Sequence, residues 1–419
     1  MSSPNYTRTK RACYFTYLAM SSIFSLPPLL FMTFREMYGI SYTLLGTLVC
    51  INFCTQLTVD LIFSFFTKYF NVKKTVRVMP LLTSAGLLVY ALVPLFFPSY
   101  AYVGLVTGTI LFSVAAGLCE VLLSPVVAAI PSEHPEKDMS ILHSLYAWGV
   151  LSVVLISSLF LKLCGTHNWM YLTLFFAALP LVSCLLFCIS PMPPMEVSHS
   201  DSSSPAASKK RGIGMALCVA CIFLGSAAEN VMTNWISGYM ETALGVAKTV
   251  GDIFGMAIFA LLLGFGRTLY AKLGRNISNV LLAGMIGAVV CYVTAGLCNV
   301  AMIALIACVL TGFCTSMLWP GTLILMEEKM PNPGIVAYAL MAAGGDFGAS
   351  IAPQAMGIIV DRVSVSAWAQ RLSETLGILP EQLGMKTGML ISAVFPLLGI
   401  GLILFIKHYF SKKNKKVPS

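Results

Sequence analysis

The strongest constraint on the fold of this 419-residue chain is its series of long apolar segments. A helix needs about 20 mostly apolar residues to cross the hydrocarbon core, because each backbone N–H and C=O must find its partner inside the segment. Twelve segments meet this condition, approximately 12–34, 43–66, 76–98, 102–130, 141–163, 168–190, 213–238, 250–271, 278–298, 300–326, 335–360 and 387–408. Charged residues make up only 10% of the chain, against roughly 25% in soluble domains. We therefore exclude a water-soluble fold and predict an all-α integral membrane protein with twelve transmembrane helices.

Lysine and arginine are unevenly divided between the two sides of these segments. With the N-terminus placed in the cytoplasm, only six of the 26 fall on the outer side, namely Arg35, Lys162, Lys248, Arg362, Arg371 and Lys386. Because positive charge is retained on the cytoplasmic side, both termini are predicted to be cytoplasmic. The net charge of +9 therefore lies mainly in inner loops and tails, where it faces anionic lipid rather than nucleic acid.

The longest inner connection covers residues 191–212 and reads PMPPMEVSHSDSSSPAASKKRG. Its proline, serine and charge content is typical of a flexible linker. We predict that it separates an N-terminal half, residues 1–190, from a C-terminal half, residues 213–419, with six helices in each. The outer connection 361–386 is polar enough to include a short surface helix.

An internal repeat supports this division. The sequence GLCEVLLSP at 117–125 returns, without a gap, 195 positions later as GFCTSMLWP at 312–320. The same offset places Glu133 on Glu328 and Gly149 on Gly344. The fourth and tenth spans are then equivalent, and the two halves are predicted to be pseudo-symmetric around an axis along the membrane normal. This arrangement is typical of a transporter that works by alternating access.

Four acidic residues lie inside predicted spans: Asp60, Glu120, Glu229 and Asp346. An ionised side chain in a span costs about 2.5–3.5 kcal/mol on insertion scales, so each acid needs a reason. No lysine or arginine lies comparably deep in the sequence to neutralise them, and burial without a cation favours the protonated form. We predict that these four residues couple transport to protons. The alternative for each is an acid that hydrogen-bonds a neighbouring helix and never titrates during transport.

Two spans carry polar stripes. In the second, Asn52, Gln56, Asp60 and Ser64 recur every four residues, which indicates either a packing seam or the wall of a pathway. The seventh has a broader polar face with Trp235 beside it, made of Ser226, Glu229, Asn230, Thr233, Asn234 and Ser237. Neutral amides, hydroxyls and an aromatic ring are the groups that bind an uncharged polyol. Tyr146 and Trp148 in the fifth span and Trp319 in the tenth are further candidates, although packing is the commoner role of such residues. His143 could relay protons or be structural.

With these residues in view, the chain resembles the major facilitator superfamily over essentially its whole length. Locally it resembles the fucose permease-like sugar:proton symporters, whose fourth helix carries Gly-x-x-Glu-x-x-x-Asn-Pro. Gly117, Glu120 and Pro125 match this pattern, and Ser124 replaces the Asn. The resemblance implies that Glu120 takes part in sugar recognition and proton handling. That family also has an Asp in its first helix, whereas the first span here has no acid, so Glu229 or Asp60 takes over that role or coupling works differently.

We therefore predict a bacterial plasma-membrane transporter, a monomer, that moves a small polar solute such as a sugar or polyol by proton symport. Its predicted solute-binding residues are Asn52, Gln56, Glu120, Ser124, His143, Tyr146, Glu229, Asn230, Asn234, Trp235 and Trp319. The alternative is proton-driven efflux of a drug or metabolite by the same superfamily. The five histidines show no ligand spacing with Asp, Glu or Cys, so we expect no metal, no cofactor and no enzymatic activity.

Overall fold

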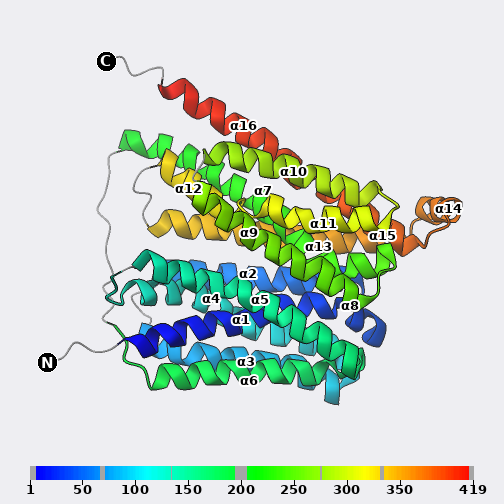
Figure 1. Cartoon of the computed structure of the whole chain (residues 1–419), viewed down its shortest axis with the longest axis horizontal. Helices are drawn as coiled ribbons and strands as arrows, with labels where there is room; N and C mark the ends of the chain where they lie inside the picture. Colours follow the sequence, from blue (N-terminus) through cyan, green and yellow to red (C-terminus); the bar gives the residue numbers. More distant parts are fainter. Residues whose placement is uncertain are drawn as a thin grey trace. The chain divides into compact units, whose positions relative to one another are not determined.

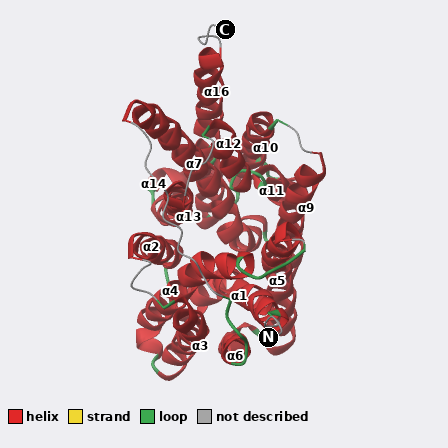
Figure 2. Cartoon of the chain, turned by 90° about the vertical axis from the view of Figure 1, so that its left-hand side faces the viewer, coloured by secondary structure: helices red, strands yellow, loops and turns green. Residues whose placement is uncertain are grey.

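The computed structural model describes residues 6–66, 71–133, 135–193, 205–273, 276–330 and 335–414. Helices and the loops between them account for all of this described part, as the secondary-structure colouring in Figure 2 shows. The helices are α1 (Thr7–Tyr38), α2 (Tyr42–Phe66), α3 (Val72–Phe96), α4 (Ala101–Ala128), α5 (Pro135–Cys164), α6 (Trp169–Cys188), α7 (Pro205–Leu244), α8 (Lys248–Val250), α9 (Ile258–Leu273), α10 (Ile277–Leu297), α11 (Ala301–Thr315), α12 (Pro320–Lys329), α13 (Ile335–Ser364), α14 (Ala367–Leu376), α15 (Pro380–Ser392) and α16 (Val394–Asn414). A π-helical stretch, Gly251–Ala257, precedes α9.

The predicted class, an all-helical membrane protein, is confirmed. Within the described ranges, ten helical segments are long and apolar enough to cross a membrane. The fifth and eleventh predicted spans coincide with α5 and α13, each of 30 residues, which are not among those ten. The total of twelve spans and the side on which the termini lie remain predictions.

The chain forms two compact units, and each unit contains two separate stretches of the sequence. Unit 1 contains Met1–Ile40 and Ile51–Ser198, and unit 2 contains Ser41–Cys50 and His199–Ser419. The start of α2 therefore packs with the C-terminal part of the chain, while the rest of α2 packs with the N-terminal part. Of the predicted linker, 191–212, residues 194–204 lie outside the described part of the chain, whereas residues 205–212 belong to the start of α7.

In unit 1, α3 packs against α4 and α6, while α1 packs against α5 and α6. Four large aromatic side chains fill the space between α1, α3, α4 and α6. Trp169 meets the ring of Phe34 edge-on at 4.9 Å, and Tyr90 lies 5.8 Å from both Phe34 and Phe112. All four are fully or almost fully buried, so this cluster is the core of unit 1.

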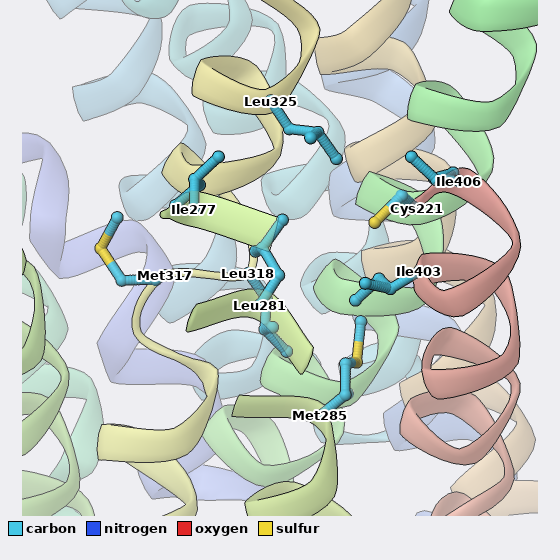
Figure 3. Close-up of a cluster of buried hydrophobic side chains, with 10 residues drawn as sticks. Cys221, Ile277, Leu281, Met285, Met317, Leu318, Leu325, Ile403 and Ile406 are labelled. Atoms are coloured by element: carbon cyan, nitrogen blue, oxygen red, sulfur yellow. The ribbon is translucent and has the colours of Figure 1, made fainter. Parts of the chain in front are cut away.

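In unit 2, α13 packs along α7, and α10 packs against α11, α15 and α16. Aliphatic and sulfur-containing side chains from α7, α10, α12, α16 and the turn between α11 and α12 form its apolar core, shown in Figure 3. Two buried tyrosines add directional contacts. The hydroxyl of Tyr292 donates to the carbonyl of Ala228 at 2.6 Å, and that of Tyr239 donates to the carbonyl of Ala295 at 2.5 Å. These bonds hold α7 in register with α10.

The start of α2 is held in unit 2 by a carboxylate. The two oxygens of Asp361 in α13 accept hydrogen bonds from the backbone N–H groups of Tyr42 and Thr43, at 3.2 and 2.6 Å. An acid suits this position because the first N–H groups of a helix lack intrahelical partners and carry partial positive charge. The Tyr42 hydroxyl also donates to Glu381 at 3.3 Å.

The tenth predicted span, 300–326, is not one helix. It is divided into α11 and α12 by a turn at residues 316–319. Pro320 explains the interruption, because it has no N–H to donate to the carbonyl of Ser316 and its ring clashes with that carbonyl in a regular helix. Pro320 instead occupies the first turn of α12, where a proline is tolerated.

Candidate functional site

The predicted site residues fall in both units, and each unit has its own polar cluster. In unit 1 this cluster joins α2 to α4. Asn52, Gln56 and Asp60 are all buried. The Oδ1 atom of Asn52 accepts hydrogen bonds from Nε2 of Gln56 at 3.1 Å and from Oγ of Ser113 at 2.6 Å. The stripe on the second span therefore faces protein, and its amides are already oriented toward one another.

Ser113 did not emerge from the sequence as a site residue. The available signal was its position on α4, seven residues before Glu120, which places both side chains on the same face of the helix. Ser113 thus links the predicted stripe on α2 with the predicted acid on α4.

Glu120 is exposed, unlike the neighbouring acid Asp60. Its helix approaches α2 at Gly117, where an added Cβ would lie 3.0 Å from Cβ of Val59 and 3.2 Å from the carbonyl oxygen of Gln56. A larger residue at 117 would push the two helices apart. Glu120 lies one turn further along α4 from this contact, and its side chain is exposed.

The other unit 1 predictions are only partly described. The side chains of Ser64, Ser124 and His143 lie outside the described residues. Tyr146 is half-buried, with its ring edge-on to Phe24 at a centroid distance of 5.7 Å. Trp148 is exposed.

In unit 2 the structure corrects the expectation that no cation lies near the buried acids. Nη2 of Arg267 in α9 lies 3.4 Å from Oε1 of Glu229 in α7. From the sequence, Arg267 was assigned to the inner loop because it lies near the end of its span. The structure continues α9 to Leu273, and the long guanidinium side chain reaches from within this helix to the carboxylate.

Arg267 also bonds to the interruption between α11 and α12. Its Nε donates to the carbonyl oxygen of Ser316 at 3.0 Å, which is the carbonyl that Pro320 leaves without a helical donor. A guanidinium group can bind the Glu229 carboxylate and the Ser316 carbonyl together, because its N–H donors point in several directions within one plane. The second carboxylate oxygen of Glu229, Oε2, is buried and has no hydrogen-bond partner among the described residues.

The remaining polar face of α7 is engaged mainly with its own helix. The side-chain amides of Asn230 and Asn234 donate to the carbonyls of Ser226 and Asn230, at 3.1 and 2.8 Å. Ser237 donates to Asp252, a buried acid that the sequence analysis did not single out. Lys248 lies 3.6 Å from the same carboxylate, so Asp252 has a structural ion pair.

The predicted aromatic residues of unit 2 lie in packed positions. Trp235 is fully buried, and its indole N–H donates to the carbonyl of Pro353 at 3.1 Å. Trp319 is half-buried against α13, where a Cβ on Gly345 would come within 2.3 Å of its ring. Asp346, the next residue, is buried. These positions make Trp235 a packing residue in this conformation, whereas Glu229 and its arginine form the charged centre of the unit.

Comparisons with known proteins agree with this architecture. The family model described as Major Facilitator Superfamily matches residues 12–353. No curated protein sequence matches the chain. Among solved structures, the chain is similar to a bacterial homologue of the human lysosomal transporter Spinster in an inward-facing, occupied conformation, with a TM-score of 0.76, 13% identity and coverage of 98% of this chain and 99% of that one.

Two solved sugar transporters have the same fold. A D-xylose-proton symporter matches with a TM-score of 0.72, 16% identity and coverage of 94% of this chain and 97% of that one. The fucose:proton symporter FucP of E. coli matches with a TM-score of 0.57, 15% identity and coverage of 94% and 99%. At these identities the similarity extends to the fold alone.

Proposed function

Because this chain belongs to the Major Facilitator Superfamily and is a transporter rather than an enzyme, we propose that it moves a small polar solute, a sugar or polyol, together with protons. The observation that carries this proposal is the exposed carboxylate of Glu120, two turns along α4 from Ser113 and its neutral hydrogen-bonded partners Asn52 and Gln56. We place the transporter in a bacterial plasma membrane.

The chemistry of this cluster favours an uncharged solute. A carboxylate accepts two hydroxyl groups at once, as on adjacent carbons of a sugar, while amides and hydroxyls both donate and accept. A cationic solute would be expected to meet more than one acid and an aromatic face. The fold shared with the xylose and fucose symporters is consistent with this solute class.

Glu120 is also the proposed proton carrier. Moving an ionised carboxylate through a closed, apolar intermediate is costly, so a bound proton lowers the barrier to alternating access. Glu229 is less suitable for this role because Arg267 already compensates its charge. Asp60 and Asp346 remain further candidates for proton binding.

The test is current recording on proteoliposomes adsorbed to a solid-supported membrane. We expect neutral sugars or polyols to evoke an inward positive current that increases with an inward proton gradient. Glu120→Gln should abolish uphill accumulation while leaving counterflow, because the neutral amide still accepts hydroxyl groups but binds no proton. Glu133→Gln, which changes an exposed acid in the following loop, should leave accumulation unchanged.

Other outcomes would contradict the proposal in distinct ways. Uphill accumulation by Glu120→Gln at the level of the wild type would exclude Glu120 as the proton carrier. Currents evoked by lipophilic cations but not by sugars would instead favour proton-driven efflux. The described residues of unit 2 include a crevice of about 250 Å³ lined mainly by apolar side chains such as Leu269, Phe313 and Met317, but its lining contains no acid that would attract a cation.

A further inference from the structure

Helix α14 carries an unusual exposed apolar face. Three apolar residues of this ten-residue helix, Trp368, Leu372 and Leu376, are between 39% and 52% exposed and are here called the α14 stripe. Their spacing of four residues puts them on one side of the helix. Val365 and Leu379, which are also exposed, lie just outside its two ends. The three side chains of the stripe form an apolar surface that needs a partner.

The other faces of α14 are different in kind. Ala369 and Ser373 are buried and fix the helix against its own unit. Gln370, Arg371 and Glu374 are exposed on the remaining side. The helix thus has one face packed on protein, one polar face and one apolar face that the described protein leaves uncovered.

The C-terminal end of α14 is held by hydrogen bonds, which helps to fix the direction in which the stripe points. Gly377 adopts a left-handed conformation with φ of 65° and terminates the helix, while the N–H of Ile378 donates to the carbonyl of Ser373 at 3.0 Å. The side chain of Gln382 then accepts from the N–H of Leu379 at 3.0 Å, at the start of α15. The stripe cannot turn inward without breaking these bonds.

The position of α14 identifies what covers the stripe. The helix joins α13 to α15 and lies at the end of unit 2 opposite to the C-terminus, drawn in orange in Figure 1. The next span, Pro380–Phe410, begins directly after it. That span exposes Leu390, Ile391, Val394 and Leu397, which form part of the lipid-facing surface of a membrane protein. The stripe therefore adjoins the start of a membrane-spanning segment, whose residues 383–386 are buried and whose lipid-facing side chains begin at Leu390.

We propose that α14 lies in the plane of the lipid–water interface, with the α14 stripe inserted between phospholipid chains and its polar face in water. In-plane helices combine an apolar face with tryptophan and a charged face in this way. Arg371 is placed to pair with a phosphate of a lipid headgroup. This inference concerns how the α13–α15 connection is anchored, and it is independent of the transported solute.

The experiment measures the depth of Trp368 in the full-length protein. Wild type and Trp368→Phe are reconstituted in phosphatidylcholine and phosphatidylglycerol vesicles, with bromine either close to the headgroup or close to the chain ends. The difference between their emission gives the Trp368 component. We expect headgroup-proximal bromine to quench this component about twofold more than deep bromine, because an interfacial helix sits only ~5–10 Å into the headgroup boundary. Trp148→Phe removes an exposed tryptophan inside a predicted span and should not remove the shallow preference.

A second pair of variants separates lipid from other partners. Leu372→Glu places a charge on the stripe and should reduce the shallow quenching of Trp368, whereas Gln370→Glu on the polar face should leave it unchanged. Equal effects of the two variants would overturn the proposal. A Trp368 component that brominated lipid does not quench but aqueous iodide does would place the stripe in water. If both quenchers fail and Leu372→Glu dissociates an oligomer, a second copy covers the stripe, and the proposal is wrong.

Discussion

The two copies of the internal repeat fold differently, although they share glycine, cysteine, leucine and proline at matching positions. In unit 1 the copy at 117–125 lies within α4, which continues past Pro125 to Ala128. In unit 2 the copy at 312–320 covers the end of α11, a turn and the first residue of α12. Each proline removes one helical donor. In unit 2 a neighbouring helix supplies a replacement, because Arg267 donates to the freed carbonyl of Ser316.

The acids of the two units also differ, both in their exposure and in whether a cation lies beside them. Glu120 lies within its repeat and is exposed, whereas the matching residue of the second copy, Thr315, is fully buried and bonds to its own helix. The acid of unit 2 is Glu229, on another helix and beside Arg267. The comparison indicates that unit 1 presents an open acid among neutral groups, while unit 2 holds a charge-compensated acid at a broken helix.

Removing Arg267 should have the largest effect on stability. Arg267→Met leaves Glu229 without its cation and Ser316 without its donor, so we expect the free energy of unfolding to fall by about 1–3 kcal/mol. Denaturant unfolding in detergent micelles, followed by circular dichroism, measures the change. Lys272→Met changes an exposed cation on the same helix and should have little effect. Adding Glu229→Gln to Arg267→Met should recover part of the loss, and no recovery would mean that the ion pair contributes nothing.

Replacing the two prolines tests the difference between the repeats directly. Pro125→Ala restores a donor within a continuous helix and should raise the free energy of unfolding by about 1 kcal/mol, less than the value for soluble helices. Pro320→Ala should change it much less, since proline is tolerated in the first turn of α12. The same unfolding assay compares them. Equal stabilisation by both substitutions would show that the interruption of α11 and α12 does not persist in solution.

The smallest effect on stability is expected for the ion pair of unit 1, and it should depend on pH. Asp138 contacts Lys10 and accepts a hydrogen bond from Ser132 at 2.6 Å, and chiefly the bond from Lys10 lowers the pKa of this carboxyl. A lowered pKa stabilises the fold fully above the unfolded-state value of about 3.9, and the contribution is lost as pH falls through the folded-state pKa. The difference in thermal stability between wild type and Asp138→Asn should therefore shrink below about pH 4. A difference that grows on acidification would reverse the sign and refute the assignment.

The helices were predictable, because the length and apolarity of a span are properties of the sequence alone. The polar stripe of the second span was also predictable, since a period of four residues on a helix places Asn52, Gln56 and Asp60 on one face. The role of Ser113 was not, because a single serine in an apolar span gives no signal until its neighbour on α2 is known. Trp235 was predicted to bind the solute because it lies beside a polar face of its helix. Its side chain is instead packed against α13, which the sequence pattern could not reveal.

By itself the sequence determined that this chain is a helical membrane protein with an internal repeat and acids inside its spans, since these follow from the periodicity and cost of polar groups in lipid. Only the tertiary structure decided which acid is paired and which is open. Arg267 and Glu229 are 38 residues apart, so their contact depends on how α7, α9 and α11 pack. The same holds for α2, whose first nine residues pack with unit 2 because Asp361, more than 300 positions later, caps its first turn. Such partners are chosen by packing between helices, which no local pattern records.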